Sequence, residues 1–181
     1  MKLRRDCVVY YMAVYIKTIQ EMFDTRAYSV SDTALDFKYA QLTGYRPDGR
    51  LVIVFGGFAD KVSIGHVKEC IAFMTTVNCT HGVVVYEDSV TPMVKKLVEN
   101  NGIIRLELFS VDELGFNITK HRLVPKHEKA SDSDLEQVKK YLDKIPSMLA
   151  SDPVARFHGF DRGTLVKVSR SDGTVAFRVV V

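Results

Sequence analysis

The sequence predicts an α/β N-terminal domain followed by a small α+β C-terminal domain. Up to Phe109, short runs of valine and isoleucine alternate with segments of helix length. Strands that alternate with helices are joined by crossovers, so we expect a βαβαβ unit with a parallel-containing sheet. The chain then ends in two strand-like runs joined by Ser171-Asp172-Gly173, a strong hairpin signal. Because the pattern changes near Asp112, we predict domains at 1–112 and 113–181.

Two helices are expected before the first strand. Apolar residues recur at helical spacing between Val8 and Arg26, which predicts an amphipathic helix with one buried face. Ser31 and Asp32 suit the N-cap of a second helix, which would run to Ala40.

Three strands alternating with two helices form the predicted βαβαβ unit. The strands are expected at 50–55, 82–86 and 103–109, and the helices at 64–77 and 92–101. Ser63 suits the cap of the first of these helices. Thr91 followed by Pro92 is a typical start for the second helix, and Gly102 marks its end.

The C-terminal domain is expected to be built differently. An extended segment at 117–124 closes at a proline and is followed by a polar stretch to residue 134 and a short helix at 135–142. Asp152 and Pro153 repeat the cap-then-proline start, and Gly159 ends that turn. Two strands at 163–170 and 174–181 form the terminal β-hairpin.

The composition is that of an ordinary globular protein. The chain has 181 residues, of which 46% are hydrophobic and 26% charged, with a net charge of +3. Residues 1–112 carry 13 basic and 13 acidic side chains, and the remainder carries 12 and 9. This balance is too weak to indicate nucleic-acid binding by itself. Three cysteines and an N-terminal apolar run too short to span a bilayer predict a soluble intracellular protein.

Two pairs of cysteine and histidine suggest a zinc site as one alternative. His66 and Cys70 share a helix face, and Cys79 and His81 follow soon after. The spacing matches no standard zinc finger, and Cys70 falls where a helix buries an apolar residue. We therefore expect no metal and no cofactor.

Nuclease chemistry is a second alternative for a parallel α/β domain. Metal-dependent cleavage needs paired carboxylates and a lysine at adjacent strand ends. Asp48 offers a first acid, but Asp60 and Lys61 are adjacent and lie outside any strand. No phosphate-binding glycine loop occurs either. We expect no catalytic residues.

The start of the helix at residue 92 is a candidate phosphate contact. Thr91 and Pro92 open the helix, and its next turn carries Lys95 and Lys96. Free backbone N–H groups, the positive end of the helix dipole and two lysines favour phosphate. The alternative is a capped surface helix with solvated lysines.

An ordered series of motifs resembles a known family. The stronger motifs lie in the second half of the chain: Asn117-Ile-Thr-Lys-His-Arg-Leu-Val-Pro-Lys-His127, Ser151-Asp-Pro-Val-Ala-Arg156, Arg162-Gly163, Val166-Lys167-Val168 and Phe177-Arg178-Val179-Val180. In the first half they are Ile16 to Met22, Arg26-Ala27-Tyr28, Gly82-Val-Val-Val and Val90-Thr-Pro-Met93. Together they resemble the fifth subunit shared by the eukaryotic nuclear RNA polymerases, whose C-terminal domain is similar to a small subunit of the archaeal RNA polymerase.

This resemblance implies a non-catalytic structural subunit of a nuclear DNA-directed RNA polymerase. The N-terminal domain would be a jaw that reaches downstream duplex DNA, with Thr91 and Pro92 closest to it. The resemblance does not include Lys95 and Lys96, which we expect to contact phosphate because of their place in the next helical turn. The C-terminal domain would dock on the largest subunit. Candidates for docking contacts, or for that domain's own core, are His121, Leu123, Val124, Pro125, His127, Asp152, Pro153, Val154, Arg156, Gly163, Lys167 and Arg178.

The sequence also departs from the family pattern. The turn Arg170-Ser171-Asp172-Gly173 is shortened, and the interval between the second helix and Leu51 is short enough to predict a missing strand. These departures indicate a divergent lineage, or a paralogue that serves fewer than all the polymerases. Two alternatives remain: a nuclease-like enzyme on the same jaw fold, and a free-standing DNA-binding regulator. The missing carboxylate–lysine set disfavours the first, and the neutral N-terminal half disfavours the second.

Overall fold

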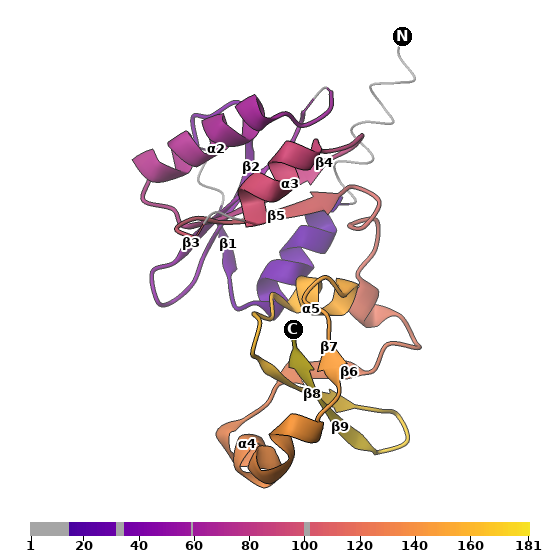
Figure 1. The fold of residues 1–181 in the computed structure, drawn as a ribbon. Helices are drawn as coiled ribbons and strands as arrows, with labels where there is room; N and C mark the ends of the chain where they lie inside the picture. The colour runs from indigo at the N-terminus through magenta and orange to yellow at the C-terminus, as the bar shows by residue number, and fades with distance from the viewer. Residues whose placement is uncertain (1–14, 32–34, 59, 100–101) are drawn as a thin grey trace. The chain divides into compact units, whose positions relative to one another are not determined.

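The chain divides into two compact units, Met1–Phe116 and Asn117–Val181. The computed structural model describes residues 15–31, 35–58, 60–99 and 102–181 (Figure 1). A five-stranded sheet lies in the first unit and a four-stranded sheet in the second. In the part of the chain that is described, no helix has the length and apolar character needed to cross a membrane.

The first unit is built on a mixed sheet with strand order β1-β2-β3-β4-β5. Its strands are β1 (Ser29–Ser31), β2 (Ala40–Tyr45), β3 (Leu51–Phe55), β4 (His81–Tyr86) and β5 (Arg105–Ser110). β1, β2 and β3 pair antiparallel, whereas β3, β4 and β5 pair parallel. The helices α2 (Ile64–Thr76) and α3 (Pro92–Glu99) connect the parallel strands. The predicted βαβαβ unit is therefore present, with two antiparallel strands added to one side.

Both faces of this sheet are covered. On one face, Ile53 and Val84 pack in a buried cluster with Met74 of α2. On the other, the first helix, described over residues 15–25, brings the buried Phe23 against the sheet. A Cβ at Gly44 would lie 2.8 Å from the Phe23 ring, so this contact requires glycine. Burial on both faces explains why the strands read as continuous apolar runs.

The second predicted helix is wrong. Residues 35–39 form a turn, and residues 40–45 form the strand β2; Asp32 lies outside the described residues. The turn is held by its aromatic side chains: Phe37 stacks on Phe73 of α2, with ring centroids 4.4 Å apart. Packing on the core outweighed the helical spacing of the segment. The strand β2 thus lies between this turn and Leu51.

The second unit is a four-stranded sheet of order β6-β8-β9-β7. Its strands are β6 (Lys126–Lys129), β7 (Ser147–Met148), β8 (Leu165–Ser169) and β9 (Val175–Val180), and its helices are η1 (Ile118–Lys120), α4 (Asp132–Val138), η2 (Lys139–Lys144) and α5 (Pro153–His158). β8 and β9 form the predicted antiparallel hairpin, and β7 pairs parallel to β9. A small core of Val166, Val168 and Val180 lies on one face.

Two expectations for this unit are wrong. The segment 117–124 is not extended, because the Asn117 side chain accepts a hydrogen bond from the Thr119 N–H (2.9 Å) and starts the short helix η1. The polar stretch after Pro125 contains the strand β6, which carries no β-branched residue and so gave no strand signal.

Candidate functional site

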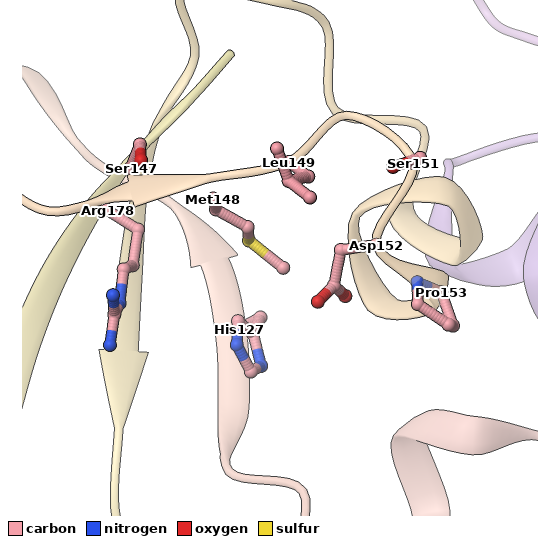
Figure 2. Close-up of a pocket in the computed structure, with 8 residues that line it drawn as sticks. All are labelled: His127, Ser147, Met148, Leu149, Ser151, Asp152, Pro153 and Arg178. Atoms are coloured by element: carbon pink, nitrogen blue, oxygen red, sulfur yellow. The ribbon is translucent and has the colours of Figure 1, made fainter.

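Four of the candidate docking residues surround one hollow in the C-terminal unit. The hollow has a volume of about 600 Å³ and receives His127 from β6, Asp152 and Pro153 from the start of α5, and Arg178 from β9. Its other lining residues are Ser147, Met148, Leu149 and Ser151. In Figure 2, Met148 lies between Arg178 and Asp152, with His127 below it. Residues more than fifty positions apart in the sequence therefore share one surface.

The His127 ring is fixed by its own strand. Its Nδ1 lies 2.8 Å from the carbonyl oxygen of Pro125. Because a carbonyl only accepts hydrogen bonds, Nδ1 carries a proton, and in the neutral ring Nε2 has the acceptor lone pair. This half-buried ring thus offers one polar atom to a partner in the hollow.

Asp152 has both a structural role and a free oxygen. Its Oδ1 accepts hydrogen bonds from the N–H groups of Val154 (2.8 Å) and Ala155 (3.4 Å), which caps α5 as predicted. Pro153 occupies the first helical position, where its missing N–H costs nothing. The other carboxylate oxygen of Asp152 has no hydrogen bond to any described residue.

Arg178 is the main unsatisfied charge of the hollow. This half-buried side chain has no hydrogen bond and no carboxylate within 4 Å among the described residues. A guanidinium presents five donors in a rigid fork that matches a carboxylate. The hollow is therefore suited to an acidic group from another molecule.

Lys167, by contrast, is used inside the unit. Its Nζ lies 2.8 Å from Asp134 Oδ1, and Ser131 donates to the other carboxylate oxygen (2.7 Å). The hydrogen bond from Lys167, followed by those from Ser131, lowers the pKa of Asp134 to about 2. Lys167 joins β8 to the start of α4 and is a structural residue here.

The remaining candidates divide between core and surface. Val154 is buried and belongs to the core side of α5, and Arg156 is half-buried on the same helix. Gly163 has a positive φ of 84°, and its N–H donates to the carbonyl oxygen of Val180 (2.8 Å). These residues shape the unit rather than line the hollow.

The turn after η1 is the most exposed apolar part of the set. Leu123 is 75% exposed, whereas Val124 and Pro125 are half-buried. His121 is exposed, and its Nδ1 accepts a hydrogen bond from the Leu123 N–H (3.3 Å). A single exposed leucine is normal on a protein surface, so Leu123 by itself does not mark a contact.

The DNA-proximal candidates lie at the C-terminal edge of the parallel strands. The loops after β3 and β4 join there, because Val62 and Val90 form a parallel bridge and the Thr91 N–H donates to Val62 O (3.3 Å). Thr91 Oγ1 accepts from the Val94 N–H (3.4 Å), which is the predicted cap. This edge is where open α/β sheets place their ligand contacts.

The start of α3 offers fewer free donors than predicted. Pro92 has no N–H, and the N–H groups of Val94 and Lys95 both bond to the Thr91 carbonyl oxygen (3.0 and 3.3 Å). In the first turn, only the N–H of Met93 is left. Lys95 and Lys96 are exposed, so the two lysines carry whatever attraction this site has for phosphate.

A buried charged cluster in the first unit was missed by sequence reasoning. The Glu107 carboxylate of β5 accepts hydrogen bonds from both terminal nitrogens of Arg26 (2.8 and 2.9 Å), and its Oε1 lies 2.7 Å from His81 Nε2. The hydroxyl of Tyr28 lies 3.1 Å from the other nitrogen of His81. Burial raises the pKa of Glu107, but the charge of Arg26 and the hydrogen bonds from His81 and Arg26 lower it further, so that its net pKa is well below normal. The sequence feature that could have predicted this cluster is a histidine and a glutamate, His81 and Glu107, at inward-facing positions of neighbouring strands.

The zinc and nuclease alternatives gain no support from the described residues. Burial raises the pKa of Cys70 to about 12, and the Cys79 thiol donates to the carbonyl oxygens of Leu51 (3.2 Å) and His81 (3.1 Å). His66 is part of the capping box of α2. Within the described ranges, no three His, Cys, Asp or Glu side chains are grouped as a metal would need.

Comparison with known proteins decides the family. Residues 116–180 match the family described as RNA polymerase Rpb5, C-terminal domain. The Dictyostelium discoideum protein named DNA-directed RNA polymerases I, II, and III subunit rpabc1 is 30% identical, over 87% of this chain and 89% of its own. The chain belongs to the RNA polymerase subunit 5 family. The family resemblance is thereby confirmed, as is the role of a polymerase subunit other than the catalytic one.

Other members of the family show its range. The Arabidopsis thaliana protein named DNA-directed RNA polymerases IV and V subunit 5B is 28% identical, over 92% of this chain and 85% of its own. A putative RNA polymerase subunit, 454R, of Invertebrate iridescent virus 6 is 33% identical over 54% of this chain and 59% of its own. Among solved structures, a repair endonuclease from Pyrococcus abyssi matches 55% of this chain and 46% of its own at 19% identity. Its TM-score of 0.41 is too low to carry an argument.

Proposed function

We propose that the C-terminal unit of this subunit docks on the largest subunit of a DNA-directed RNA polymerase through the hollow around Arg178. The N-terminal unit, the jaw of the family, then faces downstream duplex DNA with Thr91 and Pro92. The polymerase relatives from Dictyostelium and Arabidopsis support this proposal. A nuclear location follows from it.

The grouping of His127, Asp152 and Arg178 carries this proposal. An arginine without a counter-charge, an imidazole acceptor and a free carboxylate oxygen lie around one hollow of about 600 Å³. These groups make few hydrogen bonds or ion pairs within the chain, but they match a polar surface that brings a carboxylate to Arg178. The exposed Leu123 adds an apolar contact on the same unit.

Co-purification of the full-length chain with the large polymerase subunits tests the docking. Arg178→Glu replaces the cation of the hollow by a second acid, so we expect at least a tenfold loss of recovered polymerase. Arg162→Glu is the matched control, because Arg162 is exposed in the turn before β8 and does not line the hollow. Equal recovery of both variants would rule out docking at this hollow.

A further inference from the structure

A second feature of the C-terminal unit is an open strand edge on β9. β7 pairs with β9 only at Val179 and Val180, so residues 175–178 have no neighbouring strand on that side among the described residues. The Val179 N–H donates to Pro146 O (3.1 Å) on this side, whereas the Val180 N–H donates to Thr164 O (3.0 Å) on the other. Because N–H directions alternate along a strand, those of Val175 and Phe177 also point toward the open edge.

This edge borders a groove with apolar walls. The groove has a volume of about 330 Å³, too small for a folded domain but suited to a few residues of extended chain. Its apolar lining consists of the exposed Tyr141 of η2, Ile145 and Pro146, together with Val175 and Phe177 of β9. Tyr141 is 58% exposed and Val175 is 50% exposed, so both apolar surfaces are open to a partner.

The charges around the groove all have one sign. Lys144, Arg170 and Arg178 line it, and no described acidic residue does. Lys144 has no ion pair with any described carboxylate, and neither has Arg170, although Asp172 of the same turn lies close enough to feel its charge. Three cations beside a strand edge attract a negatively charged segment.

We propose that this edge binds an extended acidic segment of another protein, which adds a strand to β9. Main-chain hydrogen bonds to Val175 and Phe177 would hold the segment, as in other cases of strand addition. Side chains of such a strand alternate between the two faces of the sheet. Acidic residues therefore face the cationic side of this edge, and apolar residues face the side of Phe177, which defines an alternating acidic–apolar sequence. Nucleic acid fits less well, because it offers no strand to the exposed N–H groups.

Site-specific crosslinking in the assembled polymerase tests this proposal. Tyr141 is replaced by p-benzoylphenylalanine in the full-length chain, the complex is purified and irradiated, and the crosslinked peptide is identified by mass spectrometry. We expect a segment with at least two Asp or Glu residues alternating with apolar residues. The charge reversal Lys144→Glu with Arg170→Glu should lower the crosslink yield at least fivefold. Replacing the acidic residues of the identified segment by lysine should then restore it.

A backbone substitution separates strand addition from charge attraction alone. Val175→Pro removes one N–H from the open edge without removing a hydrogen bond to β8, and Val175→Thr keeps it. We expect the proline variant, but not the threonine variant, to lose the crosslink, while circular dichroism shows that both variants are folded. Crosslinks only within this chain, to nucleic acid, or to a segment without acidic residues would overturn the proposal. So would a yield that is insensitive to the charge reversal. Because these variants leave His127 and Arg178 unchanged, failure here is distinguishable from failure of the docking proposal.

Discussion

The two units of this subunit each hold an arginine away from full exposure, and they use it in opposite ways. In the N-terminal unit, Arg26 and Glu107 are buried and satisfy each other, with side-chain exposures of 5% and 13%. In the C-terminal unit, Arg178 is half-buried beside a hollow and has no counter-charge among the described residues. Arg26 is neutralised inside its unit, whereas Arg178 is available to another molecule.

The cores differ in the same sense. The sheet of the N-terminal unit is covered on both faces, whereas the core cluster on the C-terminal sheet is smaller, with buried Val166, Val168 and Val180 and half-buried neighbours. The excess positive charge of the chain also lies in the C-terminal part. A unit with a thin core and unmatched charge is suited to completion by a partner, and this is the physical basis for assigning assembly to it.

The largest effect is expected from breaking the buried cluster. Glu107→Ala removes the carboxylate that faces the buried Arg26, so we expect the N-terminal unit to lose about 3–5 kcal/mol of stability against unfolding. Amide hydrogen exchange at β4 and β5 measures this unit separately from the other. The control is Glu69→Gln, which removes the exposed pair with Lys38 and should leave exchange unchanged. Equal protection in both variants would mean that the cluster adds nothing to the fold.

A smaller, pH-dependent effect is expected in the C-terminal unit. The pKa of Asp134 is lowered from its ordinary value of 3.8 to about 2, so its ionised form stabilises the folded unit. That contribution is complete above about pH 4 and is lost as the pH falls toward 2. Asp134→Asn should flatten this part of the acid unfolding curve. Amide hydrogen exchange at β8 measures the curve. A curve of unchanged slope would show that the pair with Lys167 is not formed in solution.

The smallest effect is expected at the edge of the N-terminal sheet. Replacing Lys95 and Lys96 by alanine should weaken retention of downstream DNA by the polymerase only modestly, equally for all sequences and without loss of assembly. One or two phosphate contacts give a shallow salt dependence, with a slope of about −0.9 per contact. The matched control replaces Lys17 and Lys68, two exposed helix lysines, by alanine. A sequence-dependent loss would instead indicate base reading by this loop.

The alternating part of the fold was predictable because local signals agreed with packing there. Ser63 and Asp152 cap their helices as expected, and the predicted hairpin turn is present, with Gly173 at a positive φ. Residues 35–45 were misread because aromatic packing of Phe37 on Phe73, not local spacing, determines their course. β6 was missed because an edge strand of charged residues carries no hydrophobic period.

The candidate site was only partly predictable. Motif resemblance named His127, Asp152 and Arg178, but nothing in their spacing showed that they share a hollow. The lining residues Met148 and Leu149 gave no signal, because the strand β7 is two residues long. Lys167 looked equivalent to Arg178, yet its pairing with Asp134 depends on a contact between residues 33 positions apart. Long-range contacts of this kind are set by the fold and are not encoded in a local pattern.

Paired crosslinking in one assembled polymerase tests the division of roles most directly. A photoreactive residue is placed at Leu149, which lines the hollow and is 62% exposed, or at Pro92, at the start of α3. We predict that position 149 crosslinks to the largest subunit and position 92 to downstream DNA. Crosslinks to the largest subunit from position 92, with none from position 149, would contradict the account.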